Sequence, residues 1–166
     1  MIAAFGDRSR LALLAVSCAT LLACAKAPVQ EPPPPPVKVT IAIDASANAN
    51  PDVEGRPSPV TVRVYQLADG GKFQLPEFFP LWDGDAQALG PALLGRQEFH
   101  VAPGKHADGA LTLEAAARSI GVAAAFRDFR GASWRTVVPV SSEPGAPRQL
   151  KLVITVGSNT VTAAVQ

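Results

Sequence analysis

Apolar residues recur in eight short stretches of this chain, in most of which they alternate with polar residues, and turn-forming residues separate most of the stretches. In the stretch Val60–Leu67, for example, Val60, Val62 and Val64 share one face, while Thr61 and Arg63 share the other. Such alternation is typical of a strand with one face on a core. The predicted strands span residues 37–44, 60–67, 97–102, 110–115, 119–126, 134–140, 150–156 and 160–165. This pattern favours an all-β fold, an antiparallel β-sandwich.

The hydrophobic period changes after the second predicted strand and a turn at residues 69–71. Four apolar residues then recur at helical spacing, namely Leu75, Phe78, Phe79 and Trp82. Residues 85–94 form a second helical stretch, which glycines and prolines keep short. We interpret the aromatic cluster as a small core that docks the helices on a sheet, with a ligand box as the alternative. Residues 119–126 are apolar on both faces, which predicts a central strand with the helices over its small-residue face.

The longest predicted connection between strands spans residues 45–59. Three prolines and a glycine lie within its last ten residues, and each proline fixes φ and removes a backbone donor. Links between paired strands commonly have only about two to five residues. A stiff polar loop of this length can present side chains to a partner. The alternative is a solvated connection of no consequence.

The N-terminal residues have the pattern of an export signal. Arg8 and Arg10 precede an apolar stretch at residues 11–22, which is too short for a bilayer span of ~20 residues. The stretch ends in Leu21-Leu22-Ala23-Cys24, which resembles the lipobox of bacterial lipoproteins. The alternatives are an ordinary secretory signal and Cys18 as the lipid acceptor.

These features divide the chain into three parts. We predict a lipoprotein signal peptide at residues 1–23, a lipidated Cys24 with a Pro-rich tether at residues 24–36, and a β-sandwich domain at residues 37–166. Five consecutive prolines at residues 32–36 favour a polyproline II spacer, with a Pro-rich ligand as the alternative. The lipoprotein resemblance implies a triacylated cysteine. Because Ala25 follows the cysteine where inner-membrane lipoproteins tend to have Asp, it also implies the periplasmic face of the outer membrane.

The composition argues against several functions. The 15 Lys and Arg residues nearly balance the 14 Asp and Glu residues, so the basic excess of a nucleic-acid-binding protein is missing. The only histidines are His100 and His106, whereas a zinc site needs about three or four ligands. The sequence has no nucleophile elbow, Walker loop or dinucleotide fingerprint. We therefore predict no metal, no cofactor, no small-molecule substrate and no enzymatic activity.

Short motifs spread over the whole predicted domain carry a family resemblance. They are Asn50-Pro51-Asp52, Gly55-Arg56-Pro57-Ser58-Pro59, Val62-Arg63-Val64-Tyr65-Gln66-Leu67, Phe73, Phe78, Leu81, Leu89-Gly90, Pro103-Gly104, Gly121-Val122-Ala123-Ala124-Ala125-Phe126-Arg127-Asp128 and Trp134-Arg135. Together they resemble the TssJ family, the outer-membrane lipoproteins of type VI secretion systems.

The resemblance implies a transthyretin-like sandwich with a helical insertion and a structural role. Members of the family tether the secretion membrane complex by binding the periplasmic C-terminal domain of TssM, and the loop between the first two strands matters for that contact. By position, the implied contact residues here are Asn48, Asn50, Asp52, Val53, Glu54 and Arg56. The rival hypothesis is a periplasmic lipoprotein that binds a small ligand or peptide in its sandwich or aromatic insert. Arg127 and Asp128 could form a second polar site, although loop bracing is the simpler interpretation.

Overall fold

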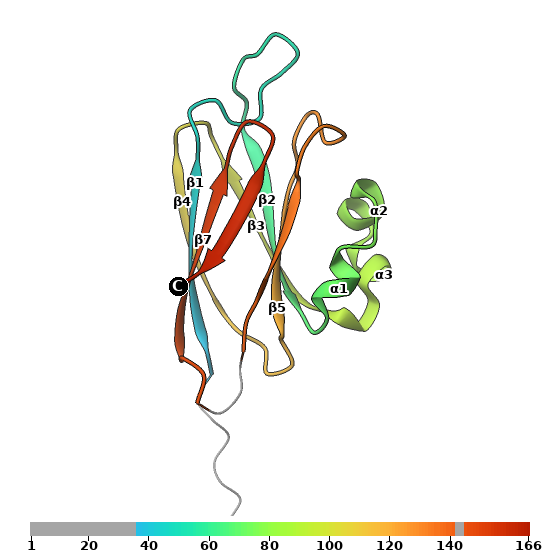
Figure 1. Cartoon of the computed structure of the whole chain (residues 1–166), viewed down its shortest axis with the longest axis vertical. Coiled ribbons are helices and arrows are strands. Elements are labelled where there is room, and N and C mark those ends of the chain that lie inside the picture. The colour runs from blue at the N-terminus through green and yellow to red at the C-terminus, as the bar shows by residue number, and fades with distance from the viewer. Residues whose placement is uncertain (1–35, 142–144) are drawn as a thin grey trace, which may run out of the picture. The chain divides into compact units, whose positions relative to one another are not determined.

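The computed structural model describes residues 36–141 and 145–166. The predicted signal peptide, Cys24 and nearly all of the tether lie outside these residues. Two four-stranded sheets pack face to face (Figure 1), which confirms the predicted β-sandwich. None of the helices in the described residues is long and apolar enough to cross a membrane.

The first sheet mixes antiparallel and parallel pairs. Its strands, from edge to edge, are β4 (His106–Thr112), β1 (Lys38–Ala45), β7 (Gln149–Val156) and β8 (Val161–Val165). β1 is antiparallel to β4 but parallel to β7, so the prediction of a purely antiparallel sandwich is wrong for this pair. Alternation reports which face of a strand is buried but carries no information on the direction of its neighbour.

The second sheet is antiparallel throughout. Its strands, from edge to edge, are β3 (Leu93–Val101), β2 (Val60–Leu67), β5 (Ser119–Ala124) and β6 (Arg135–Pro139). β5 lies between two neighbours and is buried on both faces, as the lack of a polar face predicts. The larger core lies between the two sheets, where Val39, Ile41 and Ile43 of β1 are at most 1% exposed.

A helical insertion follows β2 and covers the outer face of the second sheet. It consists of α1 (Gly70–Phe73), α2 (Phe78–Asp83), α3 (Asp85–Leu89) and a 3₁₀ turn (Gly90–Ala92). A second core forms beneath it from Tyr65, Leu67, Phe73, Leu81, Leu89 and Ala123. The insertion is where the sequence predicts helices, and its contact with the Ala123 face of β5 is also as predicted.

Two boundaries within the insertion differ from the prediction. The expected turn at residues 69–71 is the start of α1, because the Asp69 carboxylate accepts a hydrogen bond from the Gly71 amide (2.9 Å) and caps the helix. The second helical stretch ends before residue 94, because Gly90 has a φ of 53° and Pro91 follows it. Leu93 and Leu94 therefore belong to β3.

The aromatic cluster packs around Phe78, which is buried, whereas Phe79 is 53% exposed. The buried ring of Phe78 lies 4.9–5.4 Å, centroid to centroid, from four other rings, those of Phe79, Trp82, Phe129 and Trp134. Trp134 thus packs within the cluster, and the Arg135 guanidinium donates to the carbonyls of Phe73 (3.2 Å) and Pro76. Because the rings of this cluster contact one another, the cluster gives no structural support to the ligand-box alternative.

Candidate functional site: a braced loop at one end of the sandwich

The loop between β1 and β2, residues 46–59, projects beyond the ends of both sheets (Figure 1, teal). β1 runs from Lys38 at one end of the sandwich to Ala45 at the other, so the loop lies at the end opposite to the one where the chain enters the domain. The turn between β7 and β8 lies beside it, because parallel strands finish at the same edge. The segment that follows β5 also reaches this end, because β5 is antiparallel to β2.

Backbone hydrogen bonds fix the base of the loop. The Ser46 amide donates to the Val156 carbonyl (2.8 Å), and the Ser46 carbonyl accepts from the amides of Ala49 and Gly104, both at 3.0 Å. On the returning side, the Ser58 amide donates to the Ala49 carbonyl (3.1 Å). The base is therefore joined to the neighbouring loops as well as closed on itself, which restricts its conformations.

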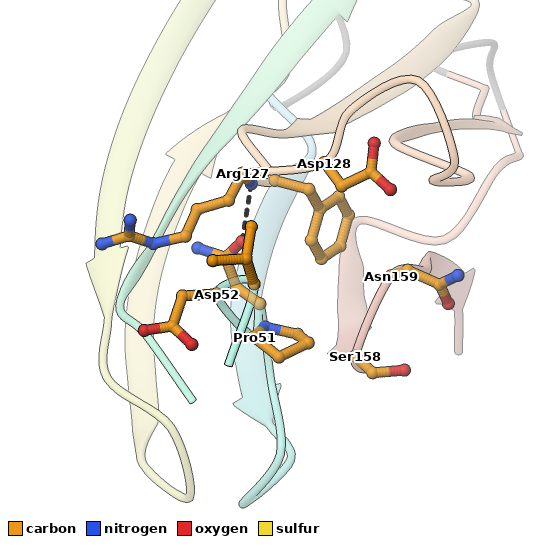
Figure 2. Close-up of a pocket in the computed structure, with 9 residues that line it drawn as sticks. Pro51, Asp52, Arg127, Asp128, Ser158 and Asn159 are labelled. Atoms are coloured by element: carbon orange, nitrogen blue, oxygen red, sulfur yellow. Dashed lines mark hydrogen bonds between the residues drawn. The ribbon is translucent and has the colours of Figure 1, made fainter. Parts of the chain in front are cut away.

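Asn50 lies at the centre of this bracing. Its side chain is 3% exposed, and its amide nitrogen donates to the Pro59 carbonyl (2.7 Å) while its amide oxygen accepts from the Arg127 backbone amide (2.7 Å; dashed in Figure 2). Its backbone amide donates to the Ser158 carbonyl (3.1 Å). It has a φ of 49°, a conformation that asparagine tolerates better than most residues. Asn50 thus holds the loop in place from within.

The tip of the loop, residues 52–56, is closed by a ring of hydrogen bonds. One oxygen of the Asp52 carboxylate accepts from the amides of Glu54 (3.0 Å) and Arg56 (2.9 Å), and the other accepts from Arg56 Nε (2.8 Å). The Asp52 amide in turn donates to the Arg56 carbonyl (2.9 Å). The Arg56 guanidinium also pairs with Glu54. Gly55, with a φ of 79°, allows the tight reversal.

Asp52 is kept ionised by this arrangement. The hydrogen bond from the Arg56 amide is the largest cause that lowers the pKa of the Asp52 carboxyl below its ordinary value. Partial desolvation opposes it, while the Arg56 side chain, the Glu54 amide and the Arg127 charge also lower the pKa. Since the charged form makes the bonds that close the tip, the tip is formed over the whole neutral pH range.

A pocket of about 600 Å³ opens beside the loop (Figure 2). Three segments line it: the loop, the residues that follow β5, and the turn between β7 and β8. The lining residues are Asn50, Pro51, Asp52, Val53, Phe126, Arg127, Asp128, Ser158 and Asn159. The Asp128 carboxylate accepts from the Gly131 amide (3.2 Å), and the Asn159 side chain donates to the Gly131 carbonyl (3.4 Å). These contacts hold the far wall of the pocket in place.

The six residues singled out from the sequence are placed differently in the loop. Asn48, Val53, Glu54 and Arg56 are exposed, and Asp52 is half-buried. Asn50 is buried and faces inward, so its side chain is not available for a direct contact. Sequence reasoning missed the rest of the pocket, chiefly Phe126, Ser158 and Asn159. Only the direction of β7 beside β1 brings the last two to the loop, and the alternation of residues does not encode that direction.

The two histidines lie on separate sheets. His100 Nδ1 lies 3.1 Å from Thr61 Oγ1, whereas His106 lies between two carboxylates, with Asp44 at Nδ1 and Asp108 at Nε2, both at 2.8 Å. The Asp44 carboxylate and then the Asp108 carboxylate raise the pKa of His106 above its ordinary value. Within the described ranges, no group of three or more His, Cys, Asp or Glu residues could hold a metal ion.

The architecture is an eight-stranded sandwich with a helical insertion and a braced loop at one end. A family model described as "Type VI secretion lipoprotein, VasD, EvfM, TssJ, VC_A0113" matches residues 37–159. The chain belongs to this TssJ family of type VI secretion lipoproteins, as its motifs indicated. It is therefore a component of the type VI secretion membrane complex.

Solved structures agree with this assignment, whereas no curated protein matches the chain in sequence. The chain is similar to the T6SS lipoprotein TssJ1 from Pseudomonas aeruginosa, with 32% identity over 80% of this chain and 98% of that one and a TM-score of 0.72. It is also similar to Serratia marcescens Lip, described as a membrane-bound component of the type VI secretion system. For Lip the identity is 26%, the coverage 78% and 97%, and the TM-score 0.70.

A third similarity is to a chain in a structure described as the T6SS protein TssM C-terminal domain (869–1107) from EAEC. The identity is 28%, the coverage is 76% of this chain and 97% of that chain, and the TM-score is 0.61. The fold seen here is thus the fold of solved members of the type VI machinery.

Proposed function

We propose that this protein is anchored by lipid on Cys24 at the periplasmic face of the outer membrane, and that its loop 46–59 binds the periplasmic C-terminal domain of TssM. In this way it would tether the type VI secretion membrane complex to that membrane. The observation that carries the proposal is a long loop, braced by the Asn50 and Asp52 hydrogen bonds, at the end of the domain opposite to chain entry. Family membership, and a similar chain in a structure described by the TssM C-terminal domain, support it.

Preformed shape favours such a role. A loop that must be ordered on binding loses conformational entropy, which reduces affinity, whereas a braced loop has already lost it on folding. Because the loop is distant from the chain's entry point, the tether and the loop leave the domain at opposite ends. That polarity suits a part that joins a membrane on one side to a protein on the other.

Binding to the partner is the direct test. Residues 33–166, which form one compact unit, would be titrated with the purified C-terminal domain of the cognate TssM. A variant with residues 52–56 replaced by a Gly/Ser link, checked for folding by circular dichroism, is expected to lose binding. Binding that survives in this variant would move the interface away from the loop. No binding by the intact domain would refute the proposal.

The anchor has its own test. In cells expressing the full chain, Cys24→Ser is expected to release the protein from the outer-membrane fraction. The reason is that the proposed lipid is attached through the sulfur of Cys24, which serine lacks. Cys18→Ser is the matched control, since it removes the other cysteine of the chain and is expected to leave the protein in that fraction. The reverse result would make Cys18 the acceptor.

A further inference from the structure

The loop tip exposes one large apolar side chain among charges that are already paired. Val53 is 100% exposed, although it sits within the hydrogen-bonded tip at residues 52–56. Its charged neighbours are engaged with one another, because Arg56 pairs with both Asp52 and Glu54. A partner that approached the tip through its charges would have to compete with these existing pairs. Glu54 and Arg56 are exposed as well, but Val53 is the apolar side chain at the tip and has no charge to desolvate when it is buried.

The pocket beside the tip continues this apolar surface. Pro51 and Val53 line it from the loop, and Phe126, which is 5% exposed, lines it from the sandwich. Asp128, Ser158 and Asn159 line the opposite side (Figure 2). Asn50, Asp52 and Arg127 complete the lining. The pocket thus combines apolar and polar groups, as protein interfaces do where one buried side chain contributes much of the binding energy.

The volume also suits a side chain. At about 600 Å³ the pocket lies within the ~300–1,000 Å³ range of pockets that bury drug-sized ligands, so it has room for a side chain together with its neighbouring residues. Its walls are held by hydrogen bonds that do not involve a ligand, namely those of Asn50 to Arg127 and of Asn159 to Gly131. The pocket is therefore preformed, and filling it would require little rearrangement of the domain.

We propose that the partner protein inserts an apolar side chain into this pocket, between Pro51, Val53 and Phe126, and that Val53 becomes buried in the contact. The inference rests on the proposed function and specifies the chemistry of its recognition surface. In this arrangement the charges of Asp52, Glu54 and Arg56 maintain the shape of the tip, and the affinity comes from apolar burial.

Two consequences distinguish this arrangement from a charge-driven contact. Removing the two γ-methyl groups of Val53 should weaken binding about tenfold, given the free energy associated with each buried carbon. Salt should have little effect on affinity, since a Debye length of ~10 Å at 0.1 M falls to ~3 Å at 1 M and weakens exposed charge contacts, while apolar burial persists.

The experiment measures the dissociation constant of residues 33–166 with the purified C-terminal domain of TssM, at low and high salt. The variants are Val53→Ala and Ser158→Phe, which places a ring in the pocket. Leu75→Ala is the matched control, because Leu75 is 79% exposed but lies on the helical insertion. Thermal unfolding of each variant establishes that it is folded.

The expected result is about a tenfold loss for Val53→Ala and a comparable or larger loss for Ser158→Phe, with Leu75→Ala close to wild type. If Val53→Ala binds with the wild-type dissociation constant while the Gly/Ser loop variant fails to bind, the inference is overturned. The proposed function then still stands. A Leu75→Ala loss equal to that of Val53→Ala would overturn it as well. If the intact domain does not bind, both the inference and the proposed function fail.

Discussion

At the scale of single residues, Asn50 shows that a residue of a projecting loop can act from the inside. Asn50, Asp52 and Val53 lie close together in the sequence and all line the pocket. They differ in exposure, since Asn50 is 3% exposed and Val53 is 100% exposed. Asn50 bonds to Pro59 and Arg127, Asp52 closes the tip, and Val53 faces solvent. The side chains that fix the shape of the loop thus differ from the one that is fully exposed.

Replacing Asn50 should destabilise the whole domain. Asn50→Ala removes two buried side-chain hydrogen bonds and leaves the Arg127 amide without its acceptor, and we expect it to lower the free energy of unfolding by about 2–3 kcal/mol. Urea denaturation measures this. Asn48→Ala is the matched control, because Asn48 is exposed and bonds only locally to Ser46, and we expect a change below about 0.5 kcal/mol. Equal effects for the two variants would contradict the structural role of Asn50.

At the scale of elements, β5 joins the sandwich to the helical insertion through its smallest residue. A Cβ added at Gly121 would lie 2.9 Å from Leu67 Cδ1 and 3.0 Å from the ring of Phe73. Phe73 is fully buried in the second core, where its ring packs 5.1 Å from that of Tyr65. The insertion can therefore approach the sheet closely only because this position lacks a side chain.

Gly121→Ala is accordingly expected to lower the free energy of unfolding by about 1–3 kcal/mol, because overpacking displaces Phe73 and Leu67. Gly95→Ala on β3 is the control, since the nearest atom there belongs to the flexible Gln66 side chain (3.3 Å). Urea denaturation of both variants, with tryptophan fluorescence to follow the insertion, gives the comparison. A Gly121→Ala protein as stable as wild type would show that the insertion can shift at no cost.

The elements also show which boundaries can be predicted from the sequence and which cannot. The pattern at Val60–Leu67 predicts β2 with its actual bounds, because alternation directly reflects burial of one face. The predictions of a turn at residues 69–71 and of a helix that includes Leu93 and Leu94 were wrong. These short elements depend on the helix cap at Asp69 and on the positive φ of Gly90. Such local features are weakly encoded compared with a repeating pattern.

At the scale of the whole molecule, the assembly of the candidate site depends on strand order. The loop itself is visible in the sequence from its length and prolines, and half of its exposed residues were singled out as contact candidates. The pocket is not visible in the sequence, because its far wall is formed by Ser158 and Asn159, which lie more than a hundred positions further along the chain. They reach the loop because β7 runs parallel to β1.

We expect the stability of the whole domain to depend on pH through one cluster, His106 with Asp44 and Asp108. The pKa of His106 is raised by Asp44 and Asp108, so these ion pairs stabilise the fold fully below an unfolded-state pKa of about 6.5. Their contribution is lost as pH rises through the higher folded-state pKa. We expect the urea midpoint of wild type to fall across this window.

The matched variants separate this cluster from the other histidine. His106→Gln should flatten the dependence of the urea midpoint on pH, whereas His100→Gln should retain it, because His100 lies 3.5 Å from Glu98, outside the cluster around His106. Parallel denaturation series on either side of neutral pH provide the measurement. If His106→Gln and wild type have the same pH profile, the two ion pairs make no net contribution in solution.

The direct continuation of β1 into the loop has a mechanical consequence. In the proposed attachment, tension between the membrane and the partner would enter at Lys38 and leave after Ala45, along a single strand. A strand rises ~3.3 Å per residue, close to the ~3.3–3.6 Å limit of a stretched chain, so it has almost no slack to give up. Its hydrogen bonds to β4 and β7 on both sides would be loaded together in shear. The domain would therefore transmit a pull mainly along β1 with very little extension, while β4 and β7 share part of the load through these hydrogen bonds.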